Sequence, residues 1–573
     1  MTAKFSKPFS LSMGVAALAL AGACSQPAPP SSSSEPALVE EATSDFEAAA
    51  DDILAAAYSP DGPGVAAIVT RNNETIYVGT IGMASIEAGT PITEDTVFRL
   101  ASITKQIAAA TLLLLVEDGL VDLDAPLGTY LPDYPEPGAS IPVRHLLNHT
   151  SGIPSYTGIP GWMTEENTSR EYSTEEMIEI FADLPAAFQP GEQLSYNNSG
   201  YVLVGAVIEA VTEKPWADVV KERIAAPLGL ESLDTGLNEA SIATFAVGYT
   251  NTETPSPAQK IHMSVPHAAG ALVSDIEDIA AWGNALHDLE VLNEASYASM
   301  IAPTVLTSGE EDTYGFGIGT GTFLDVGTIG HNGGIFGFGT DSMYIPSEDV
   351  FVAVLGNSDS FAVWPGTALE RLAALAIDKP FPTLSATDLD MDAAEPLFGV
   401  YSSADVTRSF FERDGQLFTY REGGVESEVA YAGDGVYYYG PGSLERFTFD
   451  TSSEPARMSF YTRESVSPET LTWSAPIAEE IKVDPSILET YLGTYTLDIP
   501  PIAEIAPLEG DLANGISIQL TDQPALPLQV VSDTEFAVRS AGATIRFAPT
   551  EDGRMGMTIE QGSAAYTGVM DAE

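Results

Sequence analysis

The pattern of apolar residues changes near Pro380, and this change divides the chain into two kinds of structure. Before it, apolar runs with helical spacing are mixed with short strand-like runs. After it, short aromatic and β-branched runs, separated by Gly, Asp and Pro, continue to the end. A chain of 573 residues has room for three or four domains. We therefore expect one large domain over residues 45–380 and smaller all-β domains after it.

The first region mixes helices and strands without regular alternation, which is typical of an α+β fold in which helices pack on an antiparallel sheet. Apolar spacing predicts helices over Asp45–Tyr58, Ile103–Val116, Tyr201–Val211 and Ile276–Leu286. Alternation and turn residues predict strands over Val65–Thr70, Thr75–Gly79, Val326–Ile329, Asp341–Ile345 and Val350–Leu355.

The second region carries a weak internal repeat. The segment from Leu397 to Tyr401 resembles the segment from Tyr491 to Tyr495, and 446–460 resembles 546–559. Two units of about 90 residues, each rich in short strands, predict two small antiparallel β-barrels. We place them at residues 381–479 and 480–573.

The N-terminus has the features of a bacterial secretory signal. Lys4 and Lys7 precede an apolar run from Leu11 to Ala23, which is too short for a membrane span. Ala21-Gly22-Ala23-Cys24 resembles a lipobox, in which the cysteine becomes the lipidated first residue. We expect a signal peptide over 1–23, a flexible tether over 24–44, and a periplasmic protein of the bacterial cell envelope anchored through Cys24. The alternative is an ordinary signal with an incidental cysteine.

The charge balance excludes some partners. The chain has 82 acidic and 23 basic residues, a net charge of −59, so phosphate backbones and anionic lipid headgroups would repel it. We expect no nucleic-acid partner, and contact with a membrane only through the lipid anchor. Cys24 is the only cysteine, which excludes a disulfide framework. Nothing in the pattern specifies an oligomeric state.

Several common catalytic motifs are absent. There is no Gly-x-Ser-x-Gly, no P-loop and no Gly-x-Gly-x-x-Gly opening a helix. His145 and His149 are four residues apart, but no Glu follows His145 as a zinc protease would require, so we interpret both as structural residues at a helix end. We expect neither a metal nor a cofactor.

Ser102 and Lys105 begin an otherwise apolar helix and, at i and i+3, share one face of it. A lysine desolvated there would have a lowered pKa, so that its neutral amine could take the serine proton. On spacing alone, the alternative of an N-capping Ser102 with Lys105 extending to water remains open.

Two later motifs favour the catalytic interpretation. Tyr196-Asn197-Asn198 opens an apolar helix and can place a phenol and an amide in a cleft. Gly330-His331-Asn332-Gly333-Gly334 precedes an aromatic, Gly-rich turn. Glycines in a strand mark close backbone approach, which suits an edge strand that pairs with a peptide-like substrate.

Together, Ser-x-x-Lys, Tyr-x-Asn and His-x-Gly over residues 45–380 resemble the serine β-lactamase and penicillin-binding-protein superfamily, class C type. The two predicted barrels resemble the lipocalin-like domains that follow the catalytic domain in D-aminopeptidases of this group. The resemblance implies that Ser102 is the acylated nucleophile and that Lys105 and Tyr196 exchange its proton. It also implies that Asn198 orients the substrate amide, and that the N–H groups of Ser102 and of the Gly333-Gly334 segment form an oxyanion hole.

His331 departs from the β-lactamase pattern, where a lysine takes this position. Histidine titrates near neutrality, so we expect activity to rise between roughly pH 6 and 8. The departure argues against a dedicated β-lactamase and is compatible with aminopeptidases and esterases of the family. We expect a peptidase of D-aminopeptidase or D-Ala carboxypeptidase type that acts on small or unusual peptides. An esterase of the family, a β-lactamase, and a non-hydrolytic penicillin-binding or sensor protein remain as alternatives.

Overall fold

The computed structural model describes residues 35–571 except for 252–253, 414, 423, 441, 478–482, 498–501, 509–511, 513–514, 522–524, 540, 551–552 and 562–563. Cys24 and the predicted signal peptide lie outside the described residues. The first helix, α1 (Glu35–Ala57), begins within the segment that the sequence assigned to the tether.

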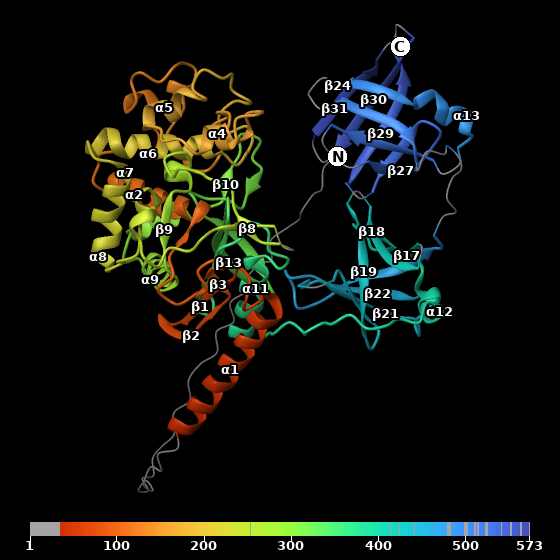
Figure 1. Ribbon diagram of the computed structural model, residues 1–573, viewed down its shortest axis with the longest axis horizontal. Coiled ribbons are helices and arrows are strands. Elements are labelled where there is room, and N and C mark those ends of the chain that lie inside the picture. Colours follow the sequence, from red (N-terminus) through yellow and green to blue (C-terminus); the bar gives the residue numbers. More distant parts are fainter. Residues whose placement is uncertain are drawn as a thin grey trace, which may run out of the picture. The chain divides into compact units, whose positions relative to one another are not determined.

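A six-stranded antiparallel sheet forms the centre of the first region (Figure 1). Its strand order is β12-β13-β14-β15-β1-β2. The strands are β12 (Gly319–Phe323), β13 (Val326–Ile335), β14 (Phe338–Ile345), β15 (Val350–Gly356), β1 (Val65–Arg71) and β2 (Glu74–Ile81).

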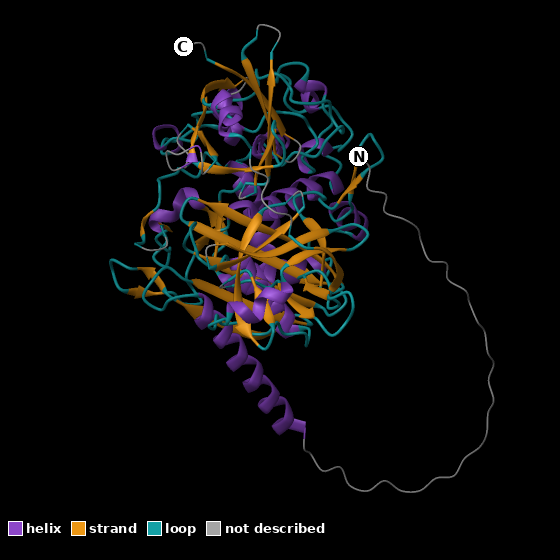
Figure 2. Ribbon diagram, turned by 90° about the vertical axis from the view of Figure 1, so that its right-hand side faces the viewer, coloured by secondary structure: helices purple, strands orange, loops and turns teal. Residues whose placement is uncertain are grey.

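The neighbouring strands β15 and β1 are buried on both faces, and their side chains alternate between two cores. In β1, Ala66 and Ile68 belong to the core beneath the helical region, whereas Val65, Ala67 and Val69 pack toward α1 and α11 (Pro365–Ala376). Figure 2 shows helices (purple) packed over the strands (orange). The sheet is thus a middle layer with helices on each side, which explains why β15 is apolar throughout and β1 is apolar from Val65 to Val69.

The helical region packs on the face of the sheet that carries the site. Its longest helices are α2 (Thr104–Glu117), α6 (Asn198–Thr212) and α9 (Ile276–His287), all rich in buried apolar residues. Shorter helices are α3 (Arg144–Leu147), α4 (Glu165–Thr168), α5 (Thr174–Glu179), α7 (Trp216–Val220), α8 (Ala226–Leu228) and α10 (Glu294–Met300). Short strands complete it: β3 (Met83–Ser85), β4 (Thr90–Pro91), β5 (Phe98–Arg99), β6 (Asp234–Thr235), β7 (Tyr249–Thr250), β8 (Ser256–Pro257), β9 (Leu272–Ser274), β10 (Thr304–Val305) and β11 (Glu311–Asp312).

Two closed antiparallel barrels follow, each preceded by a short helix. The first has α12 (Met391–Ala394), then β16 (Gly399–Ser402), β17 (Thr407–Arg413), β18 (Gln416–Arg421), β19 (Glu426–Gly433), β20 (Val436–Tyr438), β21 (Arg446–Asp450), β22 (Arg457–Tyr461) and β23 (Glu469–Ala475). The second has α13 (Pro485–Leu488), then β24 (Gly493–Leu497), β25 (Ile502–Pro507), β26 (Ile516–Leu520), β27 (Leu526–Val530), β28 (Glu535–Val538), β29 (Ala543–Pro549), β30 (Met555–Gln561) and β31 (Ala564–Met570).

The internal repeat seen in the sequence places equivalent residues in equivalent strands of the two barrels. Tyr401 in the first strand of one barrel donates its hydroxyl hydrogen to the carbonyl of Leu397, at 2.7 Å. Tyr495 in the first strand of the other makes the same bond to Tyr491, at 3.0 Å. A buried tyrosine thus fixes each strand to the turn before it, and the predicted fold class, an α+β domain followed by two barrels, is confirmed.

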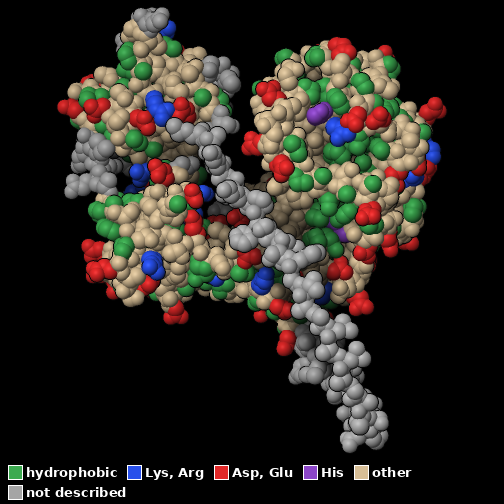
Figure 3. Space-filling model, turned by 180° about the vertical axis from the view of Figure 1, so that it is seen from behind, with side chains coloured by type: hydrophobic (Ala, Val, Ile, Leu, Met, Phe, Trp, Pro, Cys, Tyr) green, Lys and Arg blue, Asp and Glu red, His purple; other side chains and the backbone are tan. Residues whose placement is uncertain are grey.

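The surface agrees with the charge of the sequence. Acidic side chains (red) are spread over the face drawn in Figure 3, and basic ones (blue) are few. Among the helices of the described ranges, none combines the length and the apolar character that a membrane span requires.

Candidate active site

Ser102 lies in a tight turn between a strand and the central helix. The turn is a 3-10 helix, Ala101–Ile103, between β5 and α2. Ala101, just before the serine, has a φ of 49°, in the left-handed region that an alanine seldom adopts. No side chain caps α2, so Ser102 is not the N-cap that the sequence left open. A strained residue next to a serine that makes no capping bond is typical of a functional position.

Lys105 is fully buried, so its side chain does not extend to water. Its Nζ lies 3.1 Å from Ser102 Oγ, 2.9 Å from Asn198 Oδ1 and 2.8 Å from the carbonyl oxygen of Ala269. Burial holds the pKa of Lys105 well below its ordinary value. The amine is therefore neutral under conditions where an exposed lysine is charged.

The three contacts of Lys105 fix the direction of its lone pair. A neutral amine has two hydrogens, and the oxygens of Asn198 and Ala269 can only accept them. The third contact, to Ser102 Oγ, is then the one that faces the lone pair. The arrangement lets the serine hydroxyl donate its proton to the amine.

Tyr196 and Asn198 reach the same point from the start of α6. Asn197 caps that helix by accepting the N–H of Gly200. The Tyr196 ring centroid lies 4.7 Å from Lys105 Nζ. Desolvation raises the pKa of the Tyr196 hydroxyl, although 43% of the whole side chain is exposed, and a hydrogen bond with Ser102 opposes this shift. The phenol is therefore protonated at rest.

Strand β13 passes directly beside the serine because Gly333 has no side chain. A Cβ at this position would lie 2.5 Å from the carbonyl oxygen of Leu100 and 3.0 Å from the nitrogen of Ser102. The pairing of β13 with β12 ends at Gly330, opposite Gly319. By the alternation of an antiparallel ladder, the N–H groups of Asn332 and Gly334 point to the side where β12 has ended. This unpaired edge can take an extended chain.

His331 is engaged through both ring nitrogens. Its Nδ1 contacts the carbonyl oxygen of Asn332, which can only accept, so Nδ1 carries the proton. Its Nε2 then accepts the hydroxyl hydrogen of Tyr314 at 2.8 Å. Burial, with a smaller effect of Lys105, lowers the pKa of His331 to about 4. The expectation that His331 titrates between pH 6 and 8 is therefore wrong, because it ignored desolvation.

The structure brings Ser102, Lys105, Asn198 and Gly333 into one cluster, with Tyr196 and His331 at its side. The sequence did not identify Tyr314 or the carbonyl of Ala269 as parts of this cluster. Tyr314 lies in a loop with no motif around it, and a main-chain carbonyl has no signal in a sequence. Only the fold places them here.

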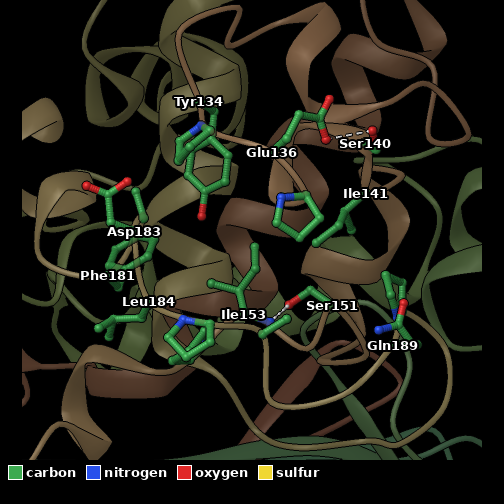
Figure 4. Close-up of a pocket in the computed structure, with 18 of the residues that line it drawn as sticks. Tyr134, Glu136, Ser140, Ile141, Ser151, Ile153, Phe181, Asp183, Leu184 and Gln189 are labelled. Carbon is green, nitrogen blue, oxygen red and sulfur yellow. Dashed lines mark hydrogen bonds between the residues drawn. The ribbon is translucent and has the colours of Figure 1, made fainter.

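A cavity of about 370 Å³ is lined in part by Ser151 and Ile153 (Figure 4). Tyr134 points its ring into it, and Phe181 and several prolines line it together with Glu136 and Asp183. Neither Ser102 nor any of the side chains clustered around it lines this cavity.

The described residues contain no group of three His, Cys, Asp or Glu side chains placed to hold a metal ion. The chemistry of the cluster is that of a serine, an amine and a phenol. These groups suffice for nucleophilic attack and proton transfer.

Comparison with known proteins matches residues 46–376 to the family model described as Beta-lactamase. The chain is 28% identical to penicillin-binding protein 4* of Bacillus subtilis, over 55% of this chain and 72% of that protein. It is 36% identical to esterase EstB of Burkholderia gladioli, over 37% of this chain and 56% of that protein. It is 25% identical to a D-aminopeptidase of Gluconobacter oxydans, over 56% of this chain and 60% of that protein. The matches to the last two thus span less than two thirds of their lengths.

Among solved structures, the chain resembles the D-amino acid amidase from Ochrobactrum anthropi SV3 complexed with D-phenylalanine. The TM-score is 0.50 at 26% identity, and the match covers 58% of this chain and 98% of that one. The shared part is the sheet with its helices, which carries the cluster.

We predict that His331→Gln leaves the pH dependence of Ser102 reactivity unchanged. With a pKa of about 4, His331 is neutral from pH 5 to 9, so glutamine removes no charge there. The rate should fall as the pH falls through the pKa of Lys105, because protonation removes its lone pair. The measurement is the rate of labelling by a fluorophosphonate from pH 5 to 9. We expect a loss of about tenfold or less, the value of one hydrogen bond. A shift of the midpoint by more than about half a pH unit would show that His331 does titrate.

Proposed function

Because the chain belongs to the Beta-lactamase family, we propose that it is a serine hydrolase that forms an acyl-enzyme on Ser102 and cleaves small peptides or amides containing D-amino acids. The observation that carries the proposal is the buried Lys105 amine, which contacts Ser102 Oγ while two acceptors hold its hydrogens. A serine placed this way is a prepared nucleophile.

Acylation starts with proton transfer. The Ser102 hydroxyl gives its proton to the neutral Lys105 amine, and Oγ bonds to the substrate carbonyl carbon. The carbonyl oxygen takes up the electron pair as an oxyanion, and the N–H groups of Ser102 and Gly334 are placed to stabilise it. Such a donor contributes about 3 kcal/mol in comparable enzymes.

The intermediate collapses when the bond to the leaving group breaks. The amine or alcohol that leaves takes a proton from Tyr196, whose raised pKa keeps the phenol protonated until then. The proton held by Lys105 then returns to Tyr196, whose ring lies beside the amine, with its centroid 4.7 Å from Nζ. Water then attacks the acyl-enzyme by the same route in reverse and releases the acid.

The edge of β13 supports a substrate with a peptide backbone. An extended acyl segment can pair with Asn332 and Gly334 in the manner of an added strand. The amide of Asn198, fixed by Lys105 Nζ and by Thr157 Oγ1, would orient the amide of such a substrate. The D-configuration is proposed from the relatives, which include a D-aminopeptidase and a D-amino acid amidase.

The state of His331 favours substrates without a free carboxylate next to the scissile bond. A lysine at this position would offer a charge, but His331 is neutral and both of its nitrogens are occupied. This supports an aminopeptidase or amidase over a D-Ala carboxypeptidase or a β-lactamase. Ester cleavage is the second candidate function, because EstB has the higher identity among the relatives described above.

The cellular location is proposed from the sequence. The signal-like N-terminus and the lipobox-like Ala21-Gly22-Ala23-Cys24 support export and lipid anchoring in the bacterial envelope. Peptides released from peptidoglycan would be within reach of an enzyme held there.

We predict that Ser102→Ala abolishes turnover while the fold is retained. The assay compares D-Ala-p-nitroanilide, L-Ala-p-nitroanilide and p-nitrophenyl butyrate, with circular dichroism as the control for folding. The wild type should prefer the D-anilide, and the variant should lose about 10⁴-fold or more because the nucleophile is gone. Turnover retained in the variant would contradict the mechanism. Cleavage of the ester alone would make the esterase the better description.

We predict that the enzyme distinguishes D-Ala-D-Ala amide from D-Ala-D-Ala with a free carboxylate. The amide should be cleaved with the higher kcat/KM, by at least about tenfold, because His331 offers neither charge nor a free N–H to the carboxylate. Liquid chromatography of the remaining dipeptide measures both, because cleavage of the free acid releases two D-Ala and cleavage of the amide only one. Equal or faster cleavage of the free acid would restore the carboxypeptidase assignment.

We predict that Cys24 is lipidated in a bacterial host. Metabolic labelling with an alkyne fatty acid should mark the full chain, and Cys24→Ser should remove the label and release the protein from the membrane fraction. Label that persists in Cys24→Ser, or a soluble unlabelled wild type, would show that the N-terminus is an ordinary signal.

A further inference from the structure

His149 lies behind the Tyr196 ring, at the end of the turn that follows α3. Its side chain is 1% exposed, and its φ of 61° is in the left-handed region, where a non-glycine residue is uncommon. The sequence predicted a structural residue at a helix end. The structure confirms the turn but also places the ring against the catalytic cluster.

Three consecutive residues of the Tyr196 segment contact His149. The N–H of Ser195 donates to the carbonyl oxygen of His149 at 2.9 Å. The Tyr196 ring centroid lies 4.3 Å from the imidazole centroid. The N–H of Asn197 donates to Nδ1 of His149 at 3.1 Å. His149 therefore contacts Tyr196 and the residue on each side of it.

These contacts require one state of the imidazole. The Asn197 N–H can only donate, so Nδ1 must be unprotonated and the proton sits on Nε2. Burial, with smaller effects of Lys105 and His331, holds the pKa of His149 well below its ordinary value, so the ring is neutral. A protonated ring could not accept the Asn197 bond.

The rest of the ring is enclosed by aromatic groups. Tyr314 lies 4.7 Å and Tyr201 5.4 Å from it, centroid to centroid. Nε2 is buried and has no hydrogen-bond partner among the described residues. Leaving a donor unsatisfied is unfavourable, so packing alone would favour an apolar side chain here. Nδ1, the ring nitrogen that accepts a hydrogen bond, is the one that faces Asn197 in the Tyr196 segment.

We propose that His149 is a positioning residue, which holds the Tyr196 hydroxyl where it can exchange protons at Ser102. This inference rests on the proposed function, since it assigns His149 a part in acyl transfer. It acts through Tyr196 and touches neither the substrate nor the reacting atoms. Its loss should lower kcat more than it changes KM, because the phenol acts on the reacting bond.

The variants separate the contacts of His149 from its backbone conformation. His149→Gly keeps the left-handed turn without strain and removes both the acceptor and the ring. His149→Asn also tolerates this φ and places an amide oxygen near the position of Nδ1. His145→Asn is the matched control, because His145 lies in the same segment but bonds to Thr150, outside the cluster.

The experiment is a double-mutant cycle between His149→Gly and Tyr196→Phe, with the full chain and the substrate that the wild type cleaves fastest. We expect His149→Gly to lower kcat by about 30-fold or more, within the range of general acid–base effects, with KM changed by less than about threefold. In the Tyr196→Phe background it should cost less than about threefold, because the group that it positions is already gone. His149→Asn should recover activity to within about tenfold of wild type.

Other outcomes overturn the inference. Equal losses from His149→Gly in both backgrounds would show that it acts on the fold as a whole, as would a loss in His145→Asn of the same size. If circular dichroism shows that His149→Gly does not fold, His149→Asn replaces it in the cycle. The inference is then overturned if His149→Asn lowers kcat by the same factor in the wild-type and Tyr196→Phe backgrounds. Failure of the proposed function would give a different result. In that case the wild-type protein itself would neither react with a fluorophosphonate at Ser102 nor hydrolyse any substrate.

Discussion

The burial of a single amine is the constraint on which the site depends. Lys105 is the first charged side chain of an otherwise apolar helix, and it is completely enclosed. An isolated ammonium would be strongly destabilised there, so the group loses its proton and becomes a base. The cost is limited because each of its hydrogens has an acceptor, one from an amide side chain and one from the main chain. The same desolvation keeps the nearby phenol and imidazoles neutral, so the cluster works without a net charge at rest.

The fold delivers the reacting groups by backbone geometry rather than by long side chains. Ala101, with its left-handed φ, places Ser102 in the 3-10 turn that precedes α2. Because Gly333 has no side chain, β13 can pass close to the Ser102 nitrogen. The helix start at Asn198 carries the amide and the phenol together. Strand β13, the turn at Ser102 and helix α6 come from segments far apart in the chain, and buried apolar residues of one core hold them together. The short distances in the cluster therefore follow from the rigid packing of that core.

The sequence predicted parts of the site where both the residue types and their spacing along a helix pointed to the same interaction. Ser102 and Lys105 share a helical face, and the lysine is surrounded by apolar residues, so both the pair and its desolvation could be predicted. The repeat in the C-terminal region predicted two barrels because its tyrosines recur at the same strand. The state of His331 could not be predicted, because its partner Tyr314 lies on a loop before β12 and only the folded structure brings the two side chains together. The contacts of His149 with the Tyr196 segment could not be predicted for the same reason, because they depend on how the turn after α3 packs in the fold.

The unpaired edge of β13 has a consequence for how the protein avoids unwanted association. An open strand edge is in general a template on which another chain, including an unfolded or aggregating one, can extend a sheet. Here the open stretch runs only from the end of the β12 pairing to the turn after Ile335, and it is interrupted by two glycines that add no side chains to grip a neighbour. Such a stretch is too short to template the extension of a sheet, yet it leaves the outward N–H groups of Asn332 and Gly334 unpaired by β12. A brief open edge therefore keeps main-chain donors available while limiting the surface on which another chain could aggregate.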